Sequence, residues 1–239
     1  MNSIIEAFHD EGFVCLRREE PATETQLVQL ASKFGKIWIT ERHRGKIPGI
    51  QKVADNALFG CDEVPWHNDW SYGRGGYFGT LLYNKTGANI AKTYFVDMAT
   101  ACAALPFECV EALRECSGEY FPSRKLQQSC FRNNEIRTLE KIRVRRPLVF
   151  NHPTCSKPVL YFSPGTLKST CGLDKTGITI DLLTSHCEDF QWSHDWQEND
   201  IVIFDNLRFM HRRDGFKGRR QLWRIQFKTG DSDPRIGTF

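Results

Sequence analysis

The segment Val64-Pro65-Trp66-His67-Asn68-Asp69-Trp70 carries a histidine and an aspartate two positions apart. On an extended chain, residues i and i+2 point to the same face, so the His67 imidazole and the Asp69 carboxylate can reach one ion. A second histidine from a neighbouring strand, His211, would complete a set of two histidines and one carboxylate, which leaves coordination positions open and suits non-haem Fe(II). The simpler interpretation is a turn in which Asp69 caps the backbone and His67 packs.

Outward from this segment, short runs rich in β-branched and aromatic residues predict strands. They are expected at residues 13–16, 37–40, 50–53, 78–83, 91–96, 148–151, 159–162, 201–204 and 221–227. Gly, Pro, Asn and Asp separate these runs, which is typical of an all-β barrel or jelly roll. Helices are expected mainly in the N-terminal half, at 4–9, 23–34, 97–105 and from Pro106 onward. Thr23 and Gln26 have the spacing of a capping box at the start of the second helix.

Length and composition are compatible with a single domain over residues 1–239. The chain is 40% hydrophobic, and its net charge of +3 points to no particular partner. Its nine cysteines include no Cys-x-x-Cys pair, which favours reduced thiols in a cytoplasmic protein. The first ten residues lack the pattern of an export signal, and no apolar run approaches the ~20 residues that a membrane span needs.

Residues 117–146 have the least regular pattern and carry many basic side chains against few acids. One interpretation is a lid or insert that attracts an anionic substrate, and the other is a solvated basic face. A nucleic-acid partner is not expected, because aromatic residues do not alternate with these basic ones as a base-stacking surface requires.

The last predicted strand has an unusual face. A period of two separates its residues into two sets, Arg220, Leu222, Arg224 and Gln226 on one side, and Gln221, Trp223, Ile225 and Phe227 on the other. Buried guanidiniums are costly unless they are paired. If the first set lines a cavity, each arginine can therefore grip a carboxylate through two hydrogen bonds. The alternative is that this face is exposed to solvent.

Together these motifs resemble the TauD/TfdA family of Fe(II)- and 2-oxoglutarate-dependent dioxygenases, over roughly residues 50–227. The resemblance is carried by Trp66-His67-Asn68-Asp69, Thr93, Asn151-His152-Pro153, Asp205-Asn206 ahead of His211, and the Arg220/Arg224 pair. It implies a double-stranded β-helix, the jelly-roll core of cupin-like proteins, with helices packed outside. One departure is that the family's Asp-Asn-Arg is here Asp205-Asn206-Leu207, with Arg208 one place later.

The resemblance also implies roles for individual residues. His67, Asp69 and His211 match the Fe(II) ligands, while Arg220 and Thr93 match the residues that hold the distal carboxylate of 2-oxoglutarate. Arg224 matches an arginine that binds the anionic group of the substrate in several members, and His152 is expected to be structural. The gap from His211 to Arg220 is short for the family, which leaves Arg219 or Arg213 as alternative anchors for the cosubstrate.

The expected protein is an oxygenase that uses Fe(II), 2-oxoglutarate and O2 to hydroxylate or desaturate a small anionic substrate, with formation of succinate and CO2. An amino acid or related small acid is the leading substrate class, with Arg224 holding its carboxylate and Gln51 meeting its amine. The same chemistry on a nucleic acid or a protein, and a catalytically silent metal-binding barrel, are the alternatives. A homo-oligomer is compatible with the sequence.

Overall fold

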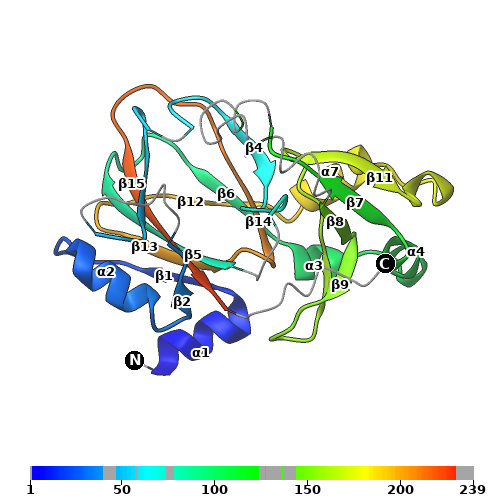
Figure 1. Ribbon diagram of the computed structural model, residues 1–239, viewed down its shortest axis with the longest axis horizontal. Coiled ribbons are helices and arrows are strands. Elements are labelled where there is room, and N and C mark those ends of the chain that lie inside the picture. The colour runs from blue at the N-terminus through cyan, green and yellow to red at the C-terminus, as the bar shows by residue number, and fades with distance from the viewer. Residues whose placement is uncertain are drawn as a thin grey trace.

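The computed structural model describes residues 2–39, 47–57, 59–73, 78–123, 127, 136 and 144–229. Its core consists of two antiparallel sheets (Figure 1). The larger sheet has six strands, in the order β1 (Phe13–Leu16), β13 (Ile201–Asp205), β5 (Phe78–Thr86), β15 (Gln221–Lys228) and β2 (Lys36–Ile37), with β3 (Ile50–Ala54) also paired to β15. The smaller sheet has the order β12 (Trp192–His194), β6 (Thr93–Asp97), β14 (Phe209–Arg213) and β4 (Val64–His67).

Side chains alternate between the two faces of the larger sheet, as a period of two requires. Those pointing inward pack against the smaller sheet in one cluster that includes Leu82, Val202, Phe204 and Leu222 together with Phe95 and Phe209. Those pointing outward pack under two helices, α1 (Asn2–Glu11) and α2 (Glu24–Ala31), in a cluster that includes Leu81, Tyr83, Ile203, Trp223, Ile225 and Phe227. The two sets predicted for the last strand therefore do face opposite sides.

Local signals at the helix ends are confirmed. Thr23 caps α2, because its hydroxyl accepts from Gln26 N at 3.3 Å while its own N–H donates to Gln26 Oε1 at 2.9 Å. Asp97 caps α3 (Met98–Ala103), its carboxylate accepting from Ala99 N at 3.0 Å. Pro106 precedes α4 (Phe107–Arg114), where the backbone is preset for a helix start.

A second group of elements covers one end of the β-core (Figure 1). It comprises α3, α4, α7 (Ile180–Glu188), the 3₁₀ helix η2 (Leu173–Lys175), the hairpin of β9 (Val149–Asn151) and β10 (Pro158–Leu160), and a three-stranded sheet. In that sheet β7 (Ser117–Tyr120) lies between β11 (Leu167–Cys171) and β8 (Val144–Pro147). These elements pack against the smaller sheet in one cluster, which includes Leu148, Leu160, Tyr161 and Phe162 together with Trp66, Val96 and Met210 of that sheet.

Several expectations from the sequence were wrong. Residues 117–120 and 144–147 are strands, and Arg146 is buried rather than part of a solvated basic face. Its Nε donates to Ser71 O at 2.7 Å, and Nη2 donates to Gly73 O. Most of the predicted lid, residues 124–126, 128–135 and 137–143, lies outside the described residues, as does residue 40 at the end of the predicted strand 37–40.

Several elements of the C-terminal half lie outside the predicted ranges, among them β11, η2, α7, β12 and β14. Helix α7 begins after Thr179, whose hydroxyl accepts from Leu182 N at 3.2 Å. Strand β14 carries His211, which agrees with the expectation that a neighbouring strand supplies the second histidine, although no strand range had been predicted around it. None of the helices in the described segments combines the length and the apolar character needed to cross a bilayer. The described cysteines are free thiols.

Candidate active site

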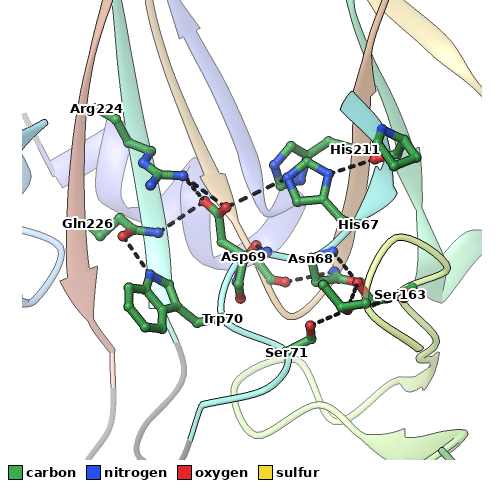
Figure 2. Close-up of polar contacts among 12 residues, drawn as sticks. His67, Asn68, Asp69, Trp70, Ser71, Ser163, His211, Arg224 and Gln226 are labelled. Atoms are coloured by element: carbon green, nitrogen blue, oxygen red, sulfur yellow. Dashed lines mark hydrogen bonds and ion pairs between the residues drawn. The ribbon is translucent and has the colours of Figure 1, made fainter. Parts of the chain in front are cut away.

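Two strands of the smaller sheet bring the two expected histidines together. His67, the last residue of β4, is paired in register with His211 of β14, and their ring centroids lie 4.2 Å apart. Asp69 follows β4 by two residues, and its Oδ1 lies 3.7 Å from His67 Nε2. One ligand atom from each of the three residues lies within 4.8 Å of the others, and Figure 2 shows them facing a common point.

Backbone carbonyls orient both imidazoles. His67 Nδ1 lies 2.8 Å from Pro65 O, and His211 Nδ1 lies 3.5 Å from Phe209 O. A carbonyl only accepts, so each Nδ1 carries the proton and each Nε2 keeps a lone pair. Burial lowers the pKa of His67, and burial together with His67 lowers the pKa of His211 to about 3. Both rings are therefore neutral at physiological pH, which is the form that binds a metal.

The Asp69 carboxylate is held by the last strand. Arg224 Nη1 lies 2.9 Å from Oδ1 and 3.0 Å from Oδ2, and Gln226 Nε2 donates to Oδ2 at 3.0 Å (Figure 2). Trp70 Nε1 in turn donates to Gln226 Oε1 at 3.1 Å. Burial opposes ionisation of Asp69, but the charge and hydrogen bonds of Arg224 outweigh it, and the pKa of this carboxyl is lowered. The site thus presents one carboxylate anion beside two neutral imidazoles.

The backbone around Asp69 is fixed from the other side by Asn206. Its Oδ1 accepts from Asp69 N and its Nδ2 donates to Asp69 O, each at 2.8 Å. Asn68 Nδ2 donates to Asn206 O at 2.9 Å and to Phe209 O at 3.2 Å, while Asn68 N donates to Ser163 Oγ at 3.0 Å (Figure 2). These bonds tie the segment after β4 to the turn between β13 and β14, so both halves of the triad share one rigid support.

A cavity opens beside the triad and contains unpaired cationic groups. Apolar side chains line it together with a larger polar set: His67, Asp69, His211, Thr80, Thr93, Arg212, Arg213, Arg220 and Arg224. Among the described residues, Arg220 Nε and Nη2, Arg213 Nε and Nη1, and Thr80 Oγ1 are buried without a hydrogen-bond partner. Burial, followed by the nearby Arg213, lowers the pKa of Arg220 to about 9. Two buried guanidiniums that share no carboxylate are costly, and an anion in the cavity would satisfy both.

The other expected site residues are placed as follows. Thr93 lines the cavity, and its hydroxyl accepts from Trp196 Nε1 at 2.9 Å. Gln51 pairs with Arg224 across β3 and β15, and Gln51 Oε1 accepts from Arg224 Nε at 3.1 Å. Arg219 is exposed and outside the cavity lining. His152 is buried, with Nε2 3.1 Å from Asp205 Oδ2 and Nδ1 accepting from Thr154 N at 3.3 Å, in a structural position as expected.

For three residues of this site, sequence reasoning named the residue but did not predict its observed contact or position. Gln226 was placed on the correct face of β15, and that period of two was the signal for its contact with Asp69. Arg213, considered only as an alternative anchor, lies two residues after His211 and so on the same face of β14, a strand that was not predicted. Nothing in the local sequence indicated that Asn206 would grip the Asp69 backbone.

Comparisons with known proteins agree with this geometry. The family described as "Taurine catabolism dioxygenase TauD, TfdA family" matches residues 1–226. No curated protein matches this sequence. Among solved structures, AAD-2 in complex with Mn(II) and N-oxalylglycine is similar with a TM-score of 0.75 and 20% identity, over 98% of this chain and 88% of that one.

Two structures from Burkholderia xenovorans are also similar. A taurine dioxygenase has a TM-score of 0.73 and 20% identity, over 100% of this chain and 84% of its own. A putative α-ketoglutarate-dependent 2,4-D dioxygenase has a TM-score of 0.70 and 22% identity, over 95% of this chain and 87% of its own. The expected double-stranded β-helix is thereby confirmed. Because the family match extends over nearly the whole chain, this protein belongs to the TauD/TfdA family of dioxygenases.

Proposed function

We propose that this protein is an Fe(II)- and 2-oxoglutarate-dependent oxygenase that hydroxylates or desaturates a small anionic molecule, with formation of succinate and CO2. The observation that carries the proposal is the combination, in one cavity, of the His67/Asp69/His211 set with two buried guanidiniums, Arg213 and Arg220, that each have N–H groups without a partner among the described residues. The first feature suits a divalent metal with open positions, and the second suits the carboxylates of 2-oxoglutarate.

The donor atoms fit both groups. Two neutral imidazoles and one carboxylate would hold Fe(II), and the bound iron would supply the position at which O2 is activated as 2-oxoglutarate is oxidised to succinate and CO2. Arg220 would hold the distal carboxylate of 2-oxoglutarate, with Thr93 beside it and Arg213 adding a second positive charge. The apolar remainder of the lining, which includes Val53, Leu82 and Phe204, would keep water from the reacting groups.

For the substrate we propose an amino acid or related small acid. Arg224 and Gln51, on adjacent strands beside the metal ligands, are the proposed contacts for its carboxylate and amine. Because Arg224 is already bonded to Asp69 and Gln51, the substrate would share this guanidinium with them. The similar structures described as taurine and 2,4-D dioxygenases support a small-molecule substrate.

The free thiols support the cytoplasmic location expected from the sequence.

The proposal is tested with Arg220→Ala and a neighbouring control, Arg219→Ala. Loss of a charge-assisted bond worth ~1.5–3 kcal/mol predicts a rise of roughly 10- to 150-fold in the KM for 2-oxoglutarate in Arg220→Ala, with unchanged Mn(II) affinity. Arg219→Ala should behave as wild type because its side chain is exposed. An unchanged KM in Arg220→Ala would indicate that Arg213, not Arg220, holds the carboxylate of 2-oxoglutarate. Failure of the wild type to form succinate with any substrate pool would indicate a catalytically silent metal-binding barrel.

The substrate class can be identified without turnover. Anaerobic protein with Fe(II) and 2-oxoglutarate is titrated with pools of small acids, amino acids and, separately, oligonucleotides, while the metal-to-ligand charge-transfer absorption is recorded. A change only with a small-acid pool supports the proposal. A change only with oligonucleotides, weakening as salt is raised, would replace it with the nucleic-acid alternative.

A further inference from the structure

A second cluster of metal-ligating side chains lies away from the candidate active site. It consists of Cys15 in β1, His194 at the end of β12 and Asp200 immediately before β13. One ligand atom from each residue lies within 4.8 Å of the other two, and none of the three lines the active-site cavity. Strands β1 and β13 belong to the larger sheet and β12 to the smaller one, so the cluster joins the two sheets (Figure 1).

The two oxygens of Asp200 differ in their surroundings. Oδ2 is well satisfied: Arg17 forms an ion pair with it, Gln197 N donates to it at 2.8 Å, and His194 Nε2 lies 3.1 Å away. Oδ1 is buried and, among the described residues, has no hydrogen-bond partner, although Asp200 as a whole is 0% exposed. An anionic oxygen left unpaired in the interior is costly, so this atom requires a further positively charged or donating group.

We propose that Cys15, His194 and Asp200 form a binding site for Zn²⁺. A thiolate, an imidazole and a carboxylate are all ligands that this ion accepts, and a water molecule would complete four-coordination. The ion would take Asp200 Oδ1, which leaves the Arg17 ion pair on Oδ2 undisturbed. Entry is from the surface, because Cys15 is half-buried and the Arg17 side chain is 48% exposed.

The protonation state of Cys15 argues against a reactive cysteine. Burial, and then the nearby Asp200, raise the pKa of the Cys15 thiol, so it is a poor nucleophile and is not prone to oxidation. It would give up its proton to solvent only when a cation occupies the cluster. Burial lowers the pKa of His194, which keeps the imidazole neutral. Its Nε2 faces the accepting Asp200 Oδ2 and carries the proton, so Nδ1 keeps the lone pair.

The cluster is connected to the active-site cavity through one tryptophan. The His194 ring packs edge-on against Trp196, with centroids 4.6 Å apart, and Trp196 Nε1 donates to the Thr93 hydroxyl at 2.9 Å. Thr93 lines the cavity and pairs with His194 across β6 and β12. Bound Zn²⁺ would therefore cross-link the two sheets next to Thr93. Its role would be structural, because it would stabilise the position of Thr93 at that end of the cavity.

Co²⁺ is the direct probe, because a cobalt–thiolate bond has a near-ultraviolet charge-transfer absorption that the thiol-free triad cannot produce. Wild-type protein should bind two equivalents of Co²⁺, and the second should bring the thiolate absorption. Cys15→Ser should lose this absorption, whereas Cys109→Ser, which removes another half-buried free thiol, should retain it. Absence of the absorption in wild type, or its persistence in Cys15→Ser, would overturn the proposal.

Calorimetry with Zn²⁺ separates the two sites. His67→Ala removes a ligand of the triad, so this variant should bind one equivalent of Zn²⁺, and His67→Ala/Cys15→Ser should bind none. The same Zn²⁺ addition should raise the thermal midpoint of His67→Ala and not that of the double variant. One equivalent bound equally by both variants would show that the remaining ion sits elsewhere, and the Cys15 site would be rejected.

Discussion

Arg224 and Asp69 form a buried ion pair in which a single guanidinium nitrogen, Nη1, lies 2.9 Å from one carboxylate oxygen and 3.0 Å from the other. The remaining nitrogens of Arg224 donate to Gln51 Oε1. The side chain expected to face the substrate is therefore bonded to a candidate metal ligand. In this geometry Arg224 sets the orientation of the Asp69 carboxylate, in addition to any contact with substrate.

Replacing Arg224 with leucine should weaken metal binding. Asp69 would lose its main counter-ion and its fixed orientation, and partners of this kind are typically worth about 10- to 100-fold in metal affinity. Calorimetric titration with Mn(II), without cosubstrate, measures the effect. Arg212→Leu is the control, since Arg212 lines the same cavity but has no hydrogen bond to Asp69 among the described contacts. Wild-type Mn(II) affinity in Arg224→Leu, with only the substrate KM raised, would show that Arg224 is purely a substrate anchor.

Replacing Arg220 with methionine should stabilise the protein in the absence of cosubstrate, by about 1 kcal/mol, because it removes a buried charge that lacks an anion. Arg213→Met is the contrast: it also removes Arg213 Nη2, which donates to Gly60 O at 3.0 Å and to Asp62 O, and should destabilise. Urea unfolding with and without N-oxalylglycine measures both changes. N-oxalylglycine should stabilise wild type but not Arg220→Met. Equal destabilisation by the two substitutions would mean that Arg220 is structural.

Replacing Asn206 with alanine should destabilise the protein by roughly 2–4 kcal/mol, because two buried backbone groups of Asp69 lose their partners. Asn56→Ala, at an exposed asparagine, should change stability by less than about 0.5 kcal/mol. Denaturant midpoints compare the two variants. A small effect at Asn206 would show that water replaces its amide, in which case the Asp69 backbone needs no side-chain support.

The Asp97–Arg208 pair should make stability depend on acid pH. Burial opposes ionisation of Asp97, but its bonds to Arg208, with Nη2 to Oδ2 at 2.6 Å, outweigh it and lower the pKa of this carboxyl. A lowered carboxyl pKa contributes stability that is fully present above about pH 4, the unfolded value, and is lost as pH falls through the folded value. Arg208→Gln should cost about 3 kcal/mol at neutral pH.

The pH profile distinguishes this ion pair from simple packing. The difference in unfolding free energy between wild type and Arg208→Gln should be constant from pH 7 to 5 and shrink below about pH 4. Arg114→Gln, which removes the more exposed pair with Glu111, should show a much smaller difference at every pH. A difference for Arg208→Gln that stays constant down to pH 3 would assign the effect to lost side-chain packing.

Much of the fold follows from local sequence patterns. The Thr23/Gln26 capping box, the caps at Asp97 and Pro106, and the two faces of β15 all depend on residues within a few positions of one another. The His-x-Asp spacing likewise indicated a metal site before any contact was known, whereas the cosubstrate role of Arg220 came from the resemblance to the family. Because side chains alternate between two faces along an extended chain, Arg220 is buried while its neighbour Arg219 is exposed.

Only the tertiary structure decided which of these groups meet. The pairing of β4 with β14 places His211 opposite His67, and Asn206 reaches the Asp69 backbone across 137 positions. Arg146 looked like one more exposed basic residue until carbonyls of Ser71 and Gly73 supplied its partners. The contact of Arg224 with Asp69 was likewise evident only in the folded structure. Local patterns report the backbone geometry of near neighbours, whereas these contacts depend on strand register and on burial by distant segments, which no short stretch of sequence encodes.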